Sequence, residues 1–269
     1  FYINLVPGAI AIALLWFTWR EEPRPTGKMV SVDYLGAAFL TLTALALLLG
    51  LNQLGTPLGW GLLAAAVVLA TGLIWAERRA VDPILPLSLF RDRLFAVSIG
   101  HGFLSGWAMF GTLNFVPLFV QAVLGTTATQ AGISLTPMSL FWTVASIISG
   151  RLLLRTSYRA MALVGMGLLT VGSFFMGTIS PDSTQLEIML FTGLMGVGMG
   201  LSIPALLVSV QTAVSKRQLG IATSTIQYSR SIGGTLGDSV MGASLSAGLA
   251  RRLLDAGLDP AAVSLNSLV

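Results

Sequence analysis

Long apolar runs separated by short polar segments form the pattern of this chain. A window of about 19 residues finds runs of helical length. Each holds close to the 20 apolar residues that a helix needs to cross about 30 Å of hydrocarbon. The runs are continuous and do not alternate with polar positions, which excludes a membrane β-barrel. The eight expected spans are residues 2–19, 33–51, 58–76, 94–123, 128–150, 159–179, 185–209 and 220–249.

Composition indicates that lipid is the solvent of these runs. Charged residues make up 10% of the 269 residues and hydrophobic residues 54%, whereas a soluble domain carries about 25% charged residues. The net charge of +4 is spread over short loops, so nucleic acid is not an expected partner. The chain has no cysteine, no Walker lysine motif, no His-Glu-x-x-His and no nucleophile elbow. We therefore expect no enzyme, catalytic residue, metal or cofactor.

Basic residues decide the orientation of the spans. Twelve of the 15 basic residues follow the first, third, fifth and seventh runs, and none follows the second, fourth or sixth. The positive-inside rule makes the basic segments cytoplasmic, so both ends of the chain are expected outside. This topology favours an excerpt, preceded by an odd number of spans and followed by at least one more.

Two polar segments and a change of composition divide the chain. Residues 21–32 predict a solvated linker, because they contain two prolines and a glycine among polar side chains. Residues 77–93 predict an amphipathic linker along the cytoplasmic interface. Between them, 33–76 holds two almost wholly apolar spans, expected to be peripheral. The later spans contain small residues four apart, which favour close helix packing: Gly102/Gly106, Gly196/Gly200 and Gly233/Gly237.

An ordered series of segments is similar to the fourteen-span drug/proton antiporters of the major facilitator superfamily, the EmrB/QacA type. The opening FYINLVPGAIAIALL, with Asn4 and Pro7, resembles that family's sixth span. DYLGAAFLTLTALALLLGL resembles the first of its two extra spans, and LPLSLFRDRLF the entry to its second bundle. NFVPLFVQAVLGTTATQAGISLTPMSL resembles the hairpin that follows this entry. Two further segments resemble late spans of the same bundle, GLMGVGMGLSIPALLVSVQTAV and QLGIATSTIQYSRSIGGTLG.

The resemblance implies an all-α polytopic membrane protein with part of the major facilitator fold and eight transmembrane helices. About five spans would precede the chain and one would follow it. The implied parts are the last helix of the N-terminal bundle (1–20), a cytoplasmic linker (21–32), two extra helices (33–76), an amphipathic linker (77–93), five C-terminal bundle helices (94–250) and an extracytoplasmic tail (251–269).

Two ionisable residues within spans are proton-coupling candidates, Asp238 and His101. A charge inside a span costs at least about 2.5 kcal/mol and usually faces a cavity or a partner. Asp238 lies about 27 Å along its helix, near the outer boundary; a partly cytoplasmic helix start would instead place Arg230 at the inner interface and Asp238 deeper. The family pattern has small apolar residues here, so Asp238 departs from it. His101 titrates near neutral pH, and a hydrogen-bonded packing role is its alternative.

Polar and aromatic residues of two spans are substrate-cavity candidates. Trp107, Phe110 and Asn114 share one helix face and would form an aromatic, weakly polar pocket for amphipathic drugs. Lipid contact explains the aromatic residues equally well, but not Asn114. The full set is Trp107, Phe110, Asn114, Gln121, Gln227 and Arg230.

The segment GRLLLRTSYR, residues 150–159, resembles a worn second copy of the superfamily's cytoplasmic gating motif. Leu154 stands where the motif has an aspartate. The gate candidates are Gly150, Arg155 and Arg159, and Arg155 would pair with an acidic group or a helix C-terminus when the inside is closed. Simple positive-inside anchoring is the alternative.

The expected function is proton-coupled efflux of drugs or other small toxic compounds by alternating access, in a multi-pass inner or plasma membrane protein. Its partners would be a small drug-like molecule, protons and the lipid bilayer, with a periplasmic adaptor also possible. Two alternatives are a selective exporter of a metabolite, peptide or siderophore on the same scaffold and a non-transporting structural or sensory membrane protein.

Overall fold

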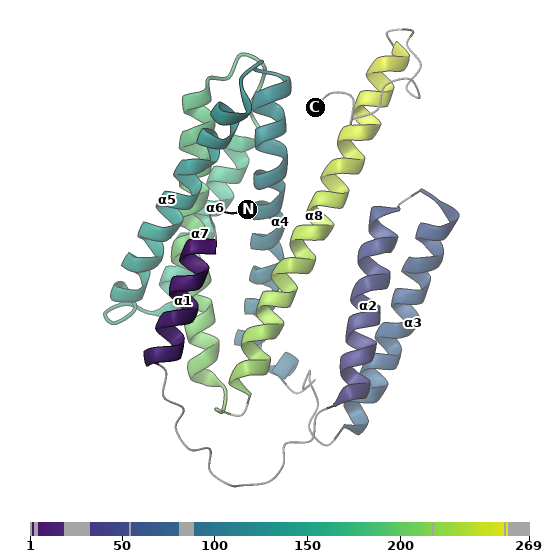
Figure 1. Ribbon diagram of the computed structural model, residues 1–269, viewed down its shortest axis with the longest axis vertical. Coiled ribbons are helices and arrows are strands. Elements are labelled where there is room, and N and C mark those ends of the chain that lie inside the picture. Colours follow the sequence, from purple (N-terminus) through teal and green to yellow (C-terminus); the bar gives the residue numbers. More distant parts are fainter. Residues whose placement is uncertain are drawn as a thin grey trace. The chain divides into compact units, whose positions relative to one another are not determined.

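The computed structural model describes residues 5–18, 33–53, 55–80, 89–216 and 218–255, with Tyr2 and Gly257. These residues form eight α-helices and a short 3-10 helix, and no strand (Figure 1). The helices are α1 (Leu5–Thr18), α2 (Tyr34–Asn52), α3 (Pro57–Arg79), η2 (Leu89–Arg91), α4 (Arg93–Ala122), α5 (Ala128–Leu152), α6 (Tyr158–Met176), α7 (Gln185–Ala213) and α8 (Leu219–Asp255).

Six helices, α2 to α7, are long and apolar enough to cross a membrane. The all-helical prediction is confirmed, and six of its eight expected spans meet this criterion. Helix α1 is apolar but has only 14 residues. Helix α8 is long enough, but its polar residues lower its hydropathy. The chain separates into two units, residues 1–32 and 33–269, and the expected linker over 21–32 lies outside the described residues.

Polar side chains at the helix starts explain why the helices begin where they do. Thr127 accepts a hydrogen bond from the Gln130 amide, and Thr184 accepts one from Glu187, each in a reciprocal capping box. Such caps satisfy amide groups that the helix itself leaves without partners. The same device recurs with a single capping side chain at Asp33, Thr56, Asp92 and Ser157.

Helix α8 extends further than the apolar run indicated. It continues to Asp255, so Arg251 and Arg252 lie in its last turns and not in a tail. Alanine, leucine and arginine favour helix, and Gly257 follows with a positive φ of 74°, a conformation that commonly ends helices. The part of the expected tail from residue 258 onward lies outside the described residues.

Helices α4 and α8 run parallel and touch through glycines. A Cβ on Gly106 would lie 2.8 Å from the carbonyl carbon of Arg230, and one on Gly233 equally close to Cα of Phe103. Neither backbone group can rotate away as a side chain could. The predicted close approach at Gly102/Gly106 and Gly233/Gly237 is therefore confirmed, and it joins these two helices to each other.

Helix α7 packs against α5 on one face and α6 on the other. Gly200 lies against Ala145 and Ser146 of α5, whereas Gly198 lies against Leu169 of α6. Hydrogen bonds add to this packing, because Thr192 Oγ1 donates to the Ser134 carbonyl at 3.0 Å. Near the other end, Ser149 Oγ donates to the Leu201 carbonyl at 3.2 Å.

Replacing Thr192 with valine is expected to destabilise the α5–α7 contact modestly. The side chain is fully buried, and the substitution removes the hydrogen bond to α5 while keeping the volume nearly the same. Hydrogen bonds between membrane helices contribute about 0.6 kcal/mol on average and up to roughly 1.7 kcal/mol. Thermal unfolding in detergent measures the loss. Thr143→Val is the matched control, because exposed Thr143 donates only to Ser139 in its own helix; equal losses in both variants would contradict the prediction.

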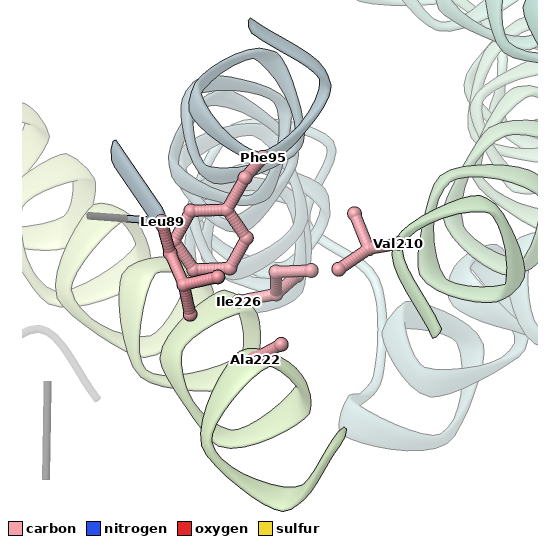
Figure 2. Close-up of a cluster of buried hydrophobic side chains, with 5 residues drawn as sticks. All are labelled: Leu89, Phe95, Val210, Ala222 and Ile226. Atoms are coloured by element: carbon pink, nitrogen blue, oxygen red, sulfur yellow. The ribbon is translucent and has the colours of Figure 1, made fainter. Parts of the chain in front are cut away.

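Four elements meet in a cluster of buried apolar side chains (Figure 2). Phe95 of α4 lies beside Leu89 of η2 and Ile226 of α8, and Ala222 of α8 and Val210 of α7 complete the cluster. Leu89 is 9% exposed. Its burial against α4 and α8 removes the side chain from solvent, and the expectation that the linker 77–93 lies along the cytoplasmic interface stays a prediction. Residues 81–88 of that linker lie outside the described residues.

Candidate functional site on helices α4 and α8

A polar stripe runs along the accessible face of α8. Three of its residues are exposed, Ser224, Gln227 and Ser231, and two are half-buried, Thr235 and Asp238. Spacings of three and four residues place them on one side of the helix. The exposed faces of α3 and α6 are mostly apolar by contrast. A polar face toward lipid is unfavourable, so this stripe is suited to a water-filled cavity.

The hydroxyl groups of the stripe donate to their own helix. Ser224 donates to the Ile221 carbonyl at 3.0 Å, Ser231 to Gln227 at 3.2 Å and Thr235 to Ser231 at 3.0 Å. Their oxygens keep free lone pairs. The stripe therefore presents mainly hydrogen-bond acceptors to anything in contact with it.

Asp238 pairs with Asn114 across the two helices. Asn114 Nδ2 donates to Asp238 Oδ2 at 2.6 Å. The other carboxylate oxygen, Oδ1, is buried and has no hydrogen-bond partner within the described residues. A buried polar atom left in this state costs roughly 1 to 3 kcal/mol, so the site favours a water molecule or another hydrogen-bond donor at Oδ1.

The register of the helices sets the depth of the ionisable groups. Counting from the first residues of α4 and α8 at about 1.5 Å per residue, His101 lies about 12 Å along, Arg230 about 17 Å and Asp238 about 28 Å. Arg230 lies opposite Gly106, well inside the helix pair. These are positions along the helices, and the membrane depths expected for Asp238 and Arg230 stay predictions.

Arg230 and His101 occupy different environments near the middle of the pair. Arg230 is half-buried and donates from Nη2 to Gln227 Oε1 on the same helix face. His101 is 7% exposed, and its Nε2 has no hydrogen-bond partner among the described residues. Ser98, one turn earlier on the same face, is fully buried and its Oγ is likewise without a partner there. The alternative for His101 was a hydrogen-bonded packing role. Among the described residues, no group bonds to its Nε2 to support that role.

The structure brings three of the predicted cavity residues together, but against α8. The Trp107 ring lies on Gly237 and the Phe110 ring on Gly234, while Asn114 reaches Asp238. Both aromatic side chains are half-buried, so part of each ring forms the helix contact and part stays accessible. Gln121 is exposed and donates to the Pro117 carbonyl of its own helix at 3.3 Å, so it does not reach Asp238.

The gate candidates lie at the turn between α5 and α6, apart from this pair. Gly150 is in α5, Arg155 in the turn and Arg159 in the first turn of α6, and all three are exposed. Among the described residues, neither arginine forms an ion pair.

Sequence reasoning missed Ser224, Ser231 and Thr235 of the polar stripe, and it missed Ser98. Their signal was the spacing of three or four residues with Gln227, Asp238 and His101, which is weak because serine and threonine also occur at helix contacts. No group of three or more His, Cys, Asp or Glu side chains suited to a metal exists in the described part of the chain.

Comparison with known proteins shows which sequences this chain is similar to. A family model described as Major Facilitator Superfamily matches residues 1–237. The chain is 34% identical over 263 residues to the multidrug transporter protein MdtP of Bacillus subtilis (strain 168). The matched region covers 95% of this chain and 48% of that protein. It is 29% identical over 248 residues to multidrug resistance protein 3 of the same organism, covering 90% of this chain and 48% of the relative.

A third relative comes from another genus. The chain is 34% identical over 232 residues to a tetracycline resistance determinant of Streptomyces rimosus, covering 83% of this chain and 67% of that protein. The chain spans about half the length of the two Bacillus relatives.

Proposed function

Since the chain belongs to the Major Facilitator Superfamily, we propose that the protein exports small drug-like compounds in exchange for protons, by alternating access. The family and the names of the relatives indicate a transporter and not an enzyme. Family membership and several membrane-spanning apolar helices indicate a multi-pass protein of the plasma membrane. Relatives named for multidrug transport, multidrug resistance and tetracycline resistance support drugs as the substrate class.

The single observation that carries the proposal is the polar stripe on α8. A helix packed in a membrane bundle that keeps an accessible polar face provides one wall of an aqueous path. The half-buried rings of Trp107 and Phe110 lie next to it and add apolar surface. Amphipathic molecules need both kinds of surface, which the two helices supply together.

We extend the proposal to the topology. Helices α1 and α8 would also cross the membrane, which gives eight spans, and the chain would belong to the fourteen-span drug/proton antiporter type. The greater length of the Bacillus relatives and the apolar pair α2–α3 support this subtype.

Within this proposal, Asp238 takes up and releases the proton at its free oxygen Oδ1, and Asn114 holds the carboxylate in place. Gln227 of the stripe and Arg230, which donates a hydrogen bond to it, contact substrate. His101 is a second titratable group on the path from the cytoplasmic side. Gly150, Arg155 and Arg159 would act at the cytoplasmic gate.

Transport through the stripe is testable with one engineered thiol. In the full-length protein with no other cysteine, Ser231→Cys should still drive efflux of a fluorescent cation from proteoliposomes with an imposed pH gradient. A charged, membrane-impermeant thiol reagent should then block efflux, and substrate should slow the block. Leu104→Cys is the control, because Leu104 is 57% exposed on the apolar side of α4.

Three outcomes would oppose the proposal. Absence of pH-driven efflux for every compound in a chemically varied panel would favour the non-transporting alternative. Block of Leu104→Cys as fast as Ser231→Cys would show that the stripe does not line the path. Efflux of one compound only would favour the selective exporter.

A further inference from the structure

The turn between α5 and α6 combines three exposed arginines with an exposed leucine. Arg151 is in the last turn of α5, Arg155 in the turn itself and Arg159 in the first turn of α6. Leu154, at the tip of the turn, is 86% exposed. We propose that this turn binds the headgroup of an anionic phospholipid, with the arginines on the phosphate and Leu154 inserted beside the acyl chains.

The backbone of the turn is well hydrogen-bonded, so it presents these side chains from a defined frame. Leu153 donates to the Ser149 carbonyl at 2.8 Å, and the amides of Arg155 and Thr156 both donate to Leu152 at 2.9 Å. Ser157 then caps α6 by accepting from the Ala160 amide at 3.2 Å. A ligand that binds here would not need to order a loose loop, which lowers the entropic cost of binding.

The charges of the turn lack compensation within the described residues. None of the three arginines forms an ion pair there. The first turn of α6 contains Arg159 and no acidic residue, although the start of a helix disfavours a positive charge. A bound anion would offset the unfavourable interaction between Arg159 and the start of α6. Guanidinium groups bind phosphate through paired hydrogen bonds, which makes a phosphate headgroup the matching chemistry.

Leu154 selects a lipid over a free phosphate compound. A large apolar side chain that is almost wholly exposed is unfavourable in water but favourable at the boundary between headgroups and acyl chains. The positive-inside rule places this turn on the cytoplasmic side, where arginines lie level with lipid phosphates. Basic positions near an anionic leaflet each favour binding roughly fivefold. The inference needs only a membrane location and is independent of the transported compound.

Photo-crosslinking with a phosphatidylglycerol probe tests the site in the full-length protein in membranes. The probe should attach to the peptide that contains residues 151–159. Unlabelled phosphatidylglycerol should compete about a hundredfold better than phosphatidylcholine. Combined substitution of the three arginines by glutamine should remove this preference, and Leu154→Ser alone should weaken attachment. Arg251→Gln with Arg252→Gln, at the opposite end of the helices, is the matched control and should change neither.

Several results would overturn the proposal. Equal competition by both lipids, or an unchanged preference in the arginine variant, would show that no such site exists. Competition by soluble glycerol phosphate as strong as that of phosphatidylglycerol would assign the site to a free phosphate compound. Arg155→Gln that abolishes efflux but leaves lipid preference intact would assign that arginine to the gate. If the combined variant fails to fold, Arg155→Gln and Leu154→Ser still decide the outcome.

Discussion

Replacing Gly106 with alanine should abolish transport and lower the stability of the protein by about 3 kcal/mol or more. The added Cβ would lie 2.8 Å from the carbonyl carbon of Arg230 and closer still to its oxygen. Those are backbone atoms of α8, so relief requires the two helices to separate along their length. Separation would also move Asn114 away from Asp238. Thermal unfolding and efflux from proteoliposomes measure the two effects.

Two other glycines of the same helix make this prediction a graded test. Gly100 has no atom within 4 Å of an added Cβ, so Gly100→Ala should leave stability and transport unchanged or slightly improved, because alanine favours helix. At Gly102 the nearest atom, the Ile226 carbonyl oxygen, is 3.0 Å away, and the loss should be intermediate. Similar effects at all three positions would mean that α4 and α8 do not touch in this register.

Replacing Asp238 with asparagine should uncouple transport from protons while keeping the fold. The new side-chain oxygen can still accept the hydrogen bond from Asn114, so packing changes little. The position loses its ability to bind and release a proton. Proton-driven accumulation should fall by about 10- to 100-fold, the range of typical coupling energies. Efflux driven by an imposed pH gradient, compared with downhill movement of the same compound, separates coupling from binding.

Asn114→Ala is the companion variant. It removes the partner of Asp238 but leaves the titratable group, so transport should persist with an altered pH dependence. Efflux by Asp238→Asn that matches the unaltered protein across about pH 6 to 9 would make Asp238 a packing residue. Loss of thermal stability in Asp238→Asn would mean that the pair is mainly structural.

The helices could be predicted because local sequence decides them. Apolar runs placed most helix ends within a few residues of their positions in the structure. The glycine pairs predicted close packing, but not which helices would meet. Helix α8 was harder, since its last turns are built from residues with high helix propensity and not from an apolar run.

The site could be predicted only in part. Asp238 and Asn114 were candidates because each is a polar residue within a span. Their hydrogen bond joins positions 124 residues apart, and the register of α4 against α8 that makes it possible comes from glycine contacts. The same contacts place the rings of Trp107 and Phe110 on α8, which the shared helix face could not indicate. Tertiary packing therefore determines both the Asn114–Asp238 hydrogen bond and the positions of the two rings.

The parallel glycine contact between α4 and α8 has a consequence for how a proton reaches Asp238. Backbone touching backbone leaves no space for one of these helices to slide past the other, so the carboxylate and its asparagine travel as a single rigid body. We therefore expect that Asp238 does not swing between two water-filled openings. Instead, the parts of the protein that face α8 move around a stationary carboxylate. The part that covers the polar face of α8 in a given state decides from which side water reaches Asp238.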